Sequence, residues 1–326
     1  MKRCVYLFAV LLTVAHVAGA ADLRRFDLPD EAGALHYYAS RPVGERSVQA
    51  ALVVLHGHPR DASRSFAAGL QAARMAGRLA DTLVVAPLYQ VEDARHCSSP
   101  GEPAAQPGDA RWTCGSWLAG EPSLGAHPIS AFAALDALVI ELVRQYPGLR
   151  NVTLAGFSAG AQMLQHSVAF AAEPPVGVGL RYVIADPGSW LYFDPVRPVA
   201  QGSGFVMELP VQACDGYNAW KYGTDALPAW LPADAGQARA RYAAARVDYL
   251  EGGLDNSAGQ GAFYPVLDKS CAAMLQGPFR LQRGLGFLAY EQAVLKVQRR
   301  MLVVPGCGHR VECVLPSAEG RSLLFD

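Results

Sequence analysis

Short apolar runs without polar alternation recur along the chain, separated by longer amphipathic stretches. Six such runs, rich in Val, Leu and Ile, have the composition of strands that are buried on both faces of a sheet. They span residues 51–55, 82–86, 152–155, 182–185, 247–250 and 301–304. Helix-like stretches span 63–79, 129–146 and 159–171. The alternation predicts an α/β fold with a mostly parallel central sheet and helices on both faces.

Residues 26–39 add a predicted antiparallel strand pair at the sheet edge, and two long segments interrupt the alternation. We expect residues 21–326 to form a single domain with insertions at about 91–127 and 189–240. Long insertions in compact domains are usually functional or disordered, and aromatic residues argue against disorder here. The insertions therefore predict walls of a cleft above the carboxyl ends of the strands, or else a small core of their own. The candidate substrate-binding residues are Trp112, Trp117, Tyr217, Trp220 and Trp230.

Residues 1–20 resemble a secretory signal peptide. Lys2 and Arg3 precede an apolar stretch at 5–14, and Ala-Gly-Ala at 18–20 is typical of a cleavage site. The alternative, an uncleaved membrane anchor, is disfavoured because the apolar stretch is short for a membrane span. We predict a secreted or periplasmic protein without a stable membrane anchor after cleavage.

Cleavage would leave six of the seven cysteines, an even number in a compartment where disulfides persist. Six cysteines can pair in fifteen ways. Proximity in the sequence suggests Cys97–Cys114 and Cys307–Cys313, which leaves Cys214–Cys271. Zinc binding is the competing interpretation, but no two of these cysteines have C-x₂-C spacing and no histidines cluster beside them.

The composition excludes several classes of protein. With 51% hydrophobic and 17% charged residues, the chain is typical of a well-packed globular protein and not of a disordered one. The formal net charge of −1 disfavours a nucleic-acid partner, because such proteins carry an excess of basic residues. Nothing in the sequence indicates an oligomeric state.

A candidate nucleophile follows the predicted strand at 152–155. Residues 156–160 read Gly-Phe-Ser-Ala-Gly, a G-x-S-x-G motif that also precedes a predicted helix. A sharp strand-to-helix turn of this kind exposes the serine at the edge of the sheet, and its glycines permit close backbone approach. The motif alone could be a plain glycine-rich turn, but its context favours Ser158 as a nucleophile.

A serine hydroxyl needs a neighbouring base, and in this arrangement an acid and then a histidine follow the serine along the chain. His166 and His309 follow Ser158; His166 falls inside the predicted helix and is directed away, whereas His309 follows the last predicted strand. Asp255, in a glycine-rich turn after the strand at 247–250, is the favoured acid. Glu251 and Asp186 are its rivals.

Two backbone N–H groups are expected to stabilise an oxyanion. One belongs to Ala159, directly after the nucleophile, and the other to His58, in the Leu-His-Gly-His-Pro loop at 55–59. His56 is expected to hydrogen-bond within the loop. A metal site at this histidine pair is the alternative, but H-x-H without a third ligand is a weak pattern. We predict neither a metal nor a cofactor.

These residues and their order resemble the α/β-hydrolase superfamily, from the loop at His56 to Gly308-His309. The elbow and the Cys-Gly-His loop are loosely similar to those of secreted polyester depolymerases and feruloyl-type esterases. In this comparison Ser158, Asp255 and His309 match the catalytic triad, and Ala159 and His58 match the oxyanion positions. The oxyanion loop departs from the His-Gly-Gly-Gly of many lipases, so lipase-like activity is not implied.

The expected function is hydrolysis of a small-molecule or polymeric carboxylic ester through an acyl-enzyme. Amide cleavage by a serine peptidase or amidase uses the same triad and remains an alternative. A binding protein without catalysis is the alternative from a different class. Because Cys307 and Cys313 flank His309, a disulfide between them is expected to brace the loop that carries the base.

Overall fold

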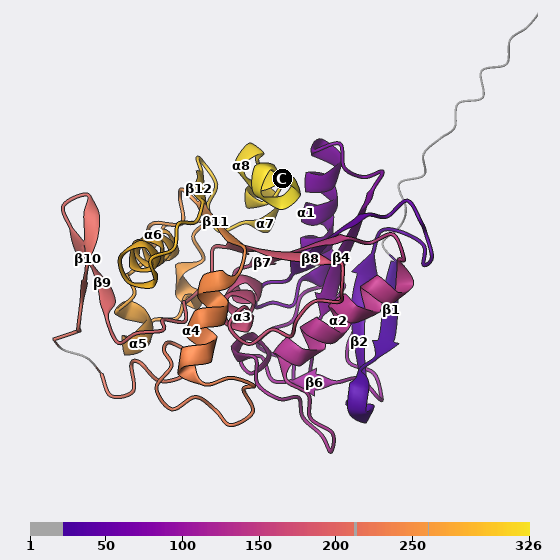
Figure 1. Ribbon diagram of the computed structural model, residues 1–326, viewed down its shortest axis with the longest axis horizontal. Coiled ribbons are helices and arrows are strands. Elements are labelled where there is room, and N and C mark those ends of the chain that lie inside the picture. The colour runs from indigo at the N-terminus through magenta and orange to yellow at the C-terminus, as the bar shows by residue number, and fades with distance from the viewer. Residues whose placement is uncertain (1–21, 212–213, 260) are drawn as a thin grey trace, which may run out of the picture.

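The computed structural model describes residues 22–211, 214–259 and 261–326, so the predicted signal peptide at 1–20 lies outside the described residues (Figure 1). A central sheet of eight strands has the spatial order β1-β2-β4-β3-β7-β8-β11-β12. Its strands are β1 (Asp22–Asp27), β2 (Ala34–Ala39), β3 (Ala50–Leu55), β4 (Thr82–Leu88), β7 (Asn151–Phe157), β8 (Gly179–Ala185), β11 (Val247–Gly252) and β12 (Met301–Val304).

The sheet is mostly parallel, as the alternating pattern predicted. Strands β4, β3, β7, β8, β11 and β12 all run in the same direction, and each of the six predicted apolar runs lies within one of them. Strands β1 and β2 form the antiparallel pair expected at the edge, and β2 joins the parallel part through an antiparallel contact with β4. Parallel neighbours need crossover connections, which the helices supply.

Helices cover both faces of the sheet (Figure 1). On one face lie α1 (Ala62–Met75), α7 (Val311–Val314) and α8 (Ala318–Phe325). On the other lie α2 (Ala131–Gln145), α3 (Ala159–Ser167), α4 (Ala235–Ala244) and α6 (Arg280–Tyr290). Along β3, Leu52 and Val54 pack toward the first face, whereas Val53 and Leu55 pack toward the second. Both faces are therefore buried, which is why the strand sequences show no polar alternation.

The smaller elements lie mainly in the predicted insertions and toward the C-terminus. They are η1 (Pro29–Glu31), β5 (Gln90–Val91), β6 (Arg111–Trp112), η2 (Trp117–Ala119), the antiparallel hairpin β9 (Arg197–Gln201) and β10 (Gly204–Glu208), η3 (Tyr264–Val266), α5 (Cys271–Met274) and η4 (Glu291–Leu295). No helix among the described residues is both long and apolar enough to span a bilayer.

The tryptophans of the first insertion do not form a cleft wall, contrary to the sequence-based expectation. Trp112 and Trp117 are both 0% exposed and belong to the same hydrophobic cluster as the central sheet. A large aromatic side chain gains most when it is completely removed from water, so these residues extend the core outward from the sheet. These two tryptophans therefore anchor the first insertion to the core, and their side chains are not accessible to a ligand.

The aromatic residues of the second insertion are also occupied by packing. Trp220 and Trp230 lie edge-on to each other, 5.8 Å apart, and both contact the ring of Phe132 on α2. The Tyr217 ring stacks on the guanidinium of Arg197, and its hydroxyl donates to the carbonyl of Pro195. The alternative interpretation, that these side chains fill a core, fits the contacts that the structure shows.

Three disulfides have the pairing that proximity suggested. Cys97–Cys114 closes a loop within the first insertion, Cys214–Cys271 ties the second insertion to the start of α5, and Cys307–Cys313 closes the short loop between β12 and α7. Each bridge therefore constrains a loop or an insertion, while the central sheet is held by hydrophobic packing.

An aromatic cluster forms much of the hydrophobic core between β11 and α6. Phe287 on α6 is fully buried, stacks on Trp190 with ring centroids 4.5 Å apart, and meets Tyr192, Tyr249 and Tyr290. Trp190 precedes much of the second insertion, so Phe287 connects that insertion to α6 and to the sheet. Removing its ring would leave a cavity that close-packed neighbours fill only in part.

We therefore expect Phe287→Ala to lower the free energy of unfolding by about 3–5 kcal/mol. The fully exposed Val176 supplies the control, and Val176→Ala should change stability by less than about 0.5 kcal/mol. Urea unfolding followed by tryptophan fluorescence measures both. Equal midpoints for the two variants would contradict the central place of Phe287 in the core.

Candidate active site

Ser158 lies on a sharp turn between β7 and α3, and the turn depends on two glycines. Ser158 has φ 58° and ψ −120°, a strained conformation for an L residue, and its N–H donates to the Ala185 carbonyl. A Cβ on Gly156 would lie 2.5 Å from the Gly160 carbonyl oxygen, and one on Gly160 would lie 2.5 Å from the His56 carbonyl oxygen. Only glycine fits at either position, and the turn presents Ser158 at the carboxyl edge of the sheet.

The structure brings Ser158, His309 and Asp255 into one hydrogen-bonded chain. The Nε2 atom of His309 is 2.7 Å from Ser158 Oγ, and its Nδ1 atom is 2.7 Å from Asp255 Oδ2. A carboxylate only accepts, so Nδ1 carries the proton, and Nε2 is left to accept the hydrogen bond of the Ser158 hydroxyl. The Cys307–Cys313 disulfide brackets the loop of His309.

His309 is buried and surrounded by groups with opposing effects on its charge. Burial is the largest effect and lowers the pKa of the imidazole below its ordinary value of 6.5, while the hydrogen bond to Asp255 acts in the opposite direction. Arg280 also lowers this pKa, and Asp61 weakly raises it. The neutral imidazole, which alone can accept a proton, is therefore favoured at neutral pH.

Asp255 is held in place by partners that sequence reasoning did not find. Its carboxylate is 2% exposed, and its Oδ1 atom is 3.3 Å from the equally buried Nη1 of Arg280. That Nη1 also donates to the Ala262 carbonyl at 2.7 Å. The Asp255 N–H donates to the Gly252 carbonyl, closing the turn after β11. The positive charge of Arg280 thus compensates the negative charge of the buried Asp255 carboxylate.

The two rival acids lie beside Asp255 but do not hydrogen-bond to His309. Asp186 follows β8 directly, is fully buried, and accepts the Gly252 N–H at 2.8 Å. Glu251 is the penultimate residue of β11 and is equally buried. Of the three candidates, the structure brings Asp255 to the imidazole.

Ligand atoms of Asp186, Asp255 and His309 lie within 4.8 Å of one another, a spacing that a metal ion could use. The imidazole does not fit that role, because Nδ1 donates to Asp255 and Nε2 accepts from Ser158, so neither nitrogen has a free lone pair. His56 is likewise occupied on both ring nitrogens, by the Gly57 carbonyl and by the Tyr89 N–H. We assign no metal ligands at either place.

The loop after β3 passes directly beside Ser158. A Cβ on Gly57 would lie 3.8 Å from the Cβ of Ser158, and the Gly57 N–H donates to Asp61 Oδ1 at 3.1 Å. Within this loop His56 donates to the Gly57 carbonyl and accepts from Tyr89, as expected for a structural histidine. Burial lowers its pKa to about 4, so it stays neutral.

Further contacts hold the loop rigid from behind. The buried Arg60 donates to the Tyr89 carbonyl at 2.9 Å and to Gln90 Oε1 at 2.5 Å. The Trp117 ring packs 4.6 Å from the ring of His56. In the described part of the chain, neither the His58 N–H nor the Ala159 N–H has a protein acceptor. Ala159 directly follows Ser158, and His58 directly follows Gly57, whose backbone lies beside Ser158.

Sequence reasoning missed Arg280, Arg60 and Asp61. Asp61 follows the predicted oxyanion loop closely enough that an Asx turn could have been suspected. Arg60 and Arg280 carried no such signal, because an arginine in a polar stretch is usually exposed. Their roles depend on contacts with residues that are distant in the sequence.

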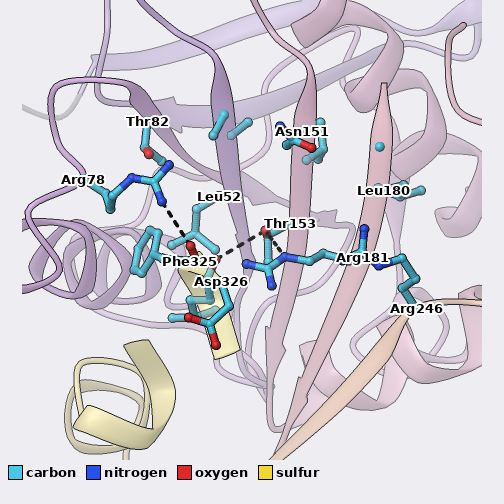
Figure 2. Close-up of a pocket in the computed structure, with 15 residues that line it drawn as sticks. Leu52, Arg78, Thr82, Asn151, Thr153, Leu180, Arg181, Arg246, Phe325 and Asp326 are labelled. Atoms are coloured by element: carbon cyan, nitrogen blue, oxygen red, sulfur yellow. Dashed lines mark hydrogen bonds between the residues drawn. The ribbon is translucent and has the colours of Figure 1, made fainter. Parts of the chain in front are cut away.

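A cavity of about 240 Å³ lies where the parallel strands begin, at the end of the sheet opposite to Ser158 (Figure 2). Asn151, the first residue of β7, lines the cavity, whereas Ser158 follows the last residue of β7. At the usual rise per strand residue, the two ends of β7 are about 20 Å apart. There Arg78 donates to the Phe325 carbonyl at 3.0 Å and Thr153 to the Leu324 carbonyl at 3.4 Å. These contacts hold the end of α8 against the sheet, and we assign the cavity no part in the candidate site.

The chain matches no known family model and no curated protein sequence. Among solved structures, poly(aspartic acid) hydrolase-1 from Sphingomonas sp. KT-1 matches with a TM-score of 0.64 and 19% identity, over 95% of this chain and 100% of that chain. LpqC, a poly(3-hydroxybutyrate) depolymerase from Bordetella parapertussis, matches with a TM-score of 0.60 and 20% identity, over 90% and 86%. An α/β serine hydrolase without lid from Xanthomonas campestris has a TM-score of 0.44 and 16% identity, over 94% and 96%.

At these identities the likeness concerns the fold. The mostly parallel sheet of eight strands, with helices on both faces, is the α/β-hydrolase fold that the sequence predicted. The chemistry of the site has to be argued from its own residues.

The geometry of the turn predicts that Gly160→Ala destabilises the protein. The new methyl group would meet backbone oxygens of His56 and Leu55, which cannot move aside as a flexible side chain would. We expect a loss of about 3 kcal/mol in the free energy of unfolding. Gly204→Ala is the control, since nothing lies within 4 Å of a Cβ there. Urea midpoints that are equal for both variants would show that the turn tolerates a side chain at Gly160.

Proposed function

We propose that this protein is an exported serine hydrolase that cleaves carboxylic ester bonds through an acyl-enzyme. The observation that carries the proposal is the continuous chain of hydrogen bonds from Ser158 through His309 to Asp255, with both heavy-atom distances at 2.7 Å. Nucleophile, base and orienting acid at such distances are the arrangement that activates a serine hydroxyl.

In the proposed mechanism His309 takes the proton of Ser158 as the serine oxygen attacks the ester carbonyl carbon. The imidazolium is stabilised by the carboxylate of Asp255, which Arg280 holds in place. His309 then gives the proton to the leaving alcohol, and the acyl group stays on Ser158. Water, deprotonated by His309, attacks the acyl-enzyme, and Ser158 leaves with the proton restored.

The N–H groups of Ala159 and His58 are the proposed oxyanion donors. Neither N–H group donates to another group in the described chain. Ala159 directly follows the strained residue Ser158, and His58 lies in the loop that passes Ser158. One such donor contributes about 3 kcal/mol to transition-state stabilisation. Arg60 and His56, which fix the loop, would keep the second donor in place before the substrate arrives.

The apolar side chains near His309 favour an ester with an apolar group. The Phe263 ring lies 6.2 Å from the His309 ring and is half exposed, and the exposed Val266 follows three residues later. Arg64 and Arg310 both form ion pairs with the single carboxylate of Glu312, so this cluster keeps a net positive charge. The poly(3-hydroxybutyrate) depolymerase is named for a polyester, which makes a polymeric ester as reasonable a substrate as a small one. Poly(aspartic acid) is a polyamide, so the name of the other matching hydrolase keeps amide cleavage as the second candidate.

Export is part of the proposal. It is supported by the signal-peptide pattern at residues 1–20 and by three disulfides, which persist mainly in oxidising compartments.

We expect Ser158→Ala to lower turnover of p-nitrophenyl esters by about 10⁴-fold or more while the circular dichroism spectrum stays unchanged. Ser167→Ala, at the end of the same helix, is the control and should retain turnover, because its hydroxyl bonds only to the Leu164 carbonyl. Parallel assays with p-nitroanilides measure amide cleavage by the same triad. Ester turnover that survives in the Ser158 variant would rule out the proposed nucleophile.

The pH profile of kcat/KM follows from the state of His309. Protonated His309 cannot accept the serine proton, and burial lowers its pKa, so the acid limb should lie below pH 6.5. In Asp255→Asn, removal of the carboxylate charge should move the limb to still lower pH and lower kcat by about 10⁴-fold. Initial rates between pH 4 and 9 measure both effects. A limb above pH 6.5 in the unaltered protein would contradict a buried, neutral base.

A further inference from the structure

Two carboxyl groups that the proposed mechanism does not use lie directly behind the triad acid. Asp186 and Glu251 are each 0% exposed; Asp186 directly follows β8, and Glu251 lies in the neighbouring strand β11. Because Ala185 of β8 is paired with Leu250 of β11, the two acids stand side by side at the next position along the sheet.

The hydrogen-bond partners of this pair are incomplete unless one member carries a proton. Asp186 Oδ1 accepts the Gly252 N–H, but Asp186 Oδ2 and both carboxyl oxygens of Glu251 find no donor among the described residues. The two carboxyl groups lie within hydrogen-bonding reach of each other. Two carboxylates can only accept, so their contact is a hydrogen bond only when one is a carboxylic acid.

The charges around the pair lead to the same conclusion. Asp255 faces both acids, and Arg280 is the cation that reaches the group. Arg283 of α6 is directed elsewhere, to the carbonyls of Gly188 and Asp268. On the other side, His309 is neutral at rest. Three ionised acids beside one arginine in a buried site would leave a large uncompensated negative charge.

The pKa shifts have the direction that this crowding predicts. Burial, followed by the charge of Asp186, holds the pKa of Glu251 well above its usual range. Burial, followed by the charge of Asp255, also raises the pKa of Asp186 above its usual range. Glu251 is therefore the member that keeps the proton most firmly.

The absence of a side chain at Gly284 of α6 leaves space for the Glu251 carboxyl group. A Cβ on Gly284 would lie 2.2 Å from Glu251 Oε1, so any larger residue at that position would displace the carboxyl. The space is formed by backbone of α6, which makes the position of Glu251 well defined.

We propose that Glu251 and Asp186 share one proton at neutral pH, as a buried carboxylic acid and carboxylate, and that this pair positions Asp255. The Glu251 O–H donates to Asp186 Oδ2, and Asp186 Oδ1 holds the N–H of Gly252. The Gly252 carbonyl in turn accepts the Asp255 N–H, so the pair anchors the first residue of the turn that carries the triad acid. The catalytic consequence rests on the proposed function, whereas the shared proton does not.

Infrared spectroscopy of the full mature chain at pH 8 tests the proton directly. The carboxylic acid C=O band should be present in the unaltered protein and in Ser158→Ala, and absent in Glu251→Gln. Glu291→Gln is the matched control, because Glu291 is also fully buried and has a raised pKa, of about 7, but pairs with Arg299 away from the site. Absence of the band from the unaltered protein, or its persistence in Glu251→Gln, would overturn the proposal.

The pH dependence of stability gives a second measurement. Above about pH 4.3 an unfolded Glu251 is ionised while the folded one keeps its proton, so the free energy of unfolding should fall as pH rises until the folded-state pKa is passed. Glu251→Gln should remove the equivalent of about one bound proton from this slope. An unchanged slope would contradict the proposal.

Activity measurements test the positioning role. Glu251→Gln can still donate to Asp186 and should keep kcat within about threefold, whereas Glu251→Leu should lower kcat at least about tenfold with KM little changed. Equal kcat values would overturn positioning. If the Leu variant does not fold, Asp186→Ala, which removes the acceptor of the Gly252 N–H, replaces it, with the same outcome expected. A protein that shows the infrared band but has no esterase activity would refute the proposed function and leave the proton pair standing.

Discussion

The candidate site depends on keeping one carboxylate charged inside the protein. Asp255 is 2% exposed, and its charge is needed to orient His309 and to stabilise the imidazolium that forms during catalysis. A buried charge is costly unless it is paired, and here Arg280 supplies the pairing from the first turn of α6. On our account the same requirement explains why the neighbouring Asp186 and Glu251 must share a proton, since a second and third charge would lack partners.

The backbone meets a separate constraint on the other side of the imidazole. Ser158 reaches His309 only because the turn between β7 and α3 is tight. In this turn Gly160 of α3 packs against the backbone at the end of β3, and Gly156 of β7 packs against Gly160. The loop after β3 then passes Ser158 and is fixed by His56 and Arg60. Strands that run in parallel deliver these segments to one edge of the sheet, which is where ligands of such folds bind. Sheet, turn and loop thus place the chemistry, and the disulfide beside His309 holds the last segment.

Much of this arrangement could be predicted from the sequence, for identifiable reasons. Buried parallel strands leave continuous apolar runs, and the turn at Ser158 leaves two glycines at fixed spacing. Chain order then indicated His309 and favoured Asp255. The burial of Trp112 and Trp117 could not be predicted, because composition does not show whether an aromatic side chain faces the core or a cleft. Arg280 lies 25 residues from Asp255, and no local pattern links them.

Reaction with a fluorophosphonate, followed by mass spectrometry of the digested protein, tests the central claim most directly, because the reagent reports an activated serine whatever the natural substrate. The account predicts one phosphonyl group per chain, located on Ser158, and its loss when His309 is replaced by Ala or when the protein is unfolded beforehand. Absence of labelling in the folded protein would contradict the claim. So would labelling of another serine, or labelling of Ser158 at the same rate in the His309 variant.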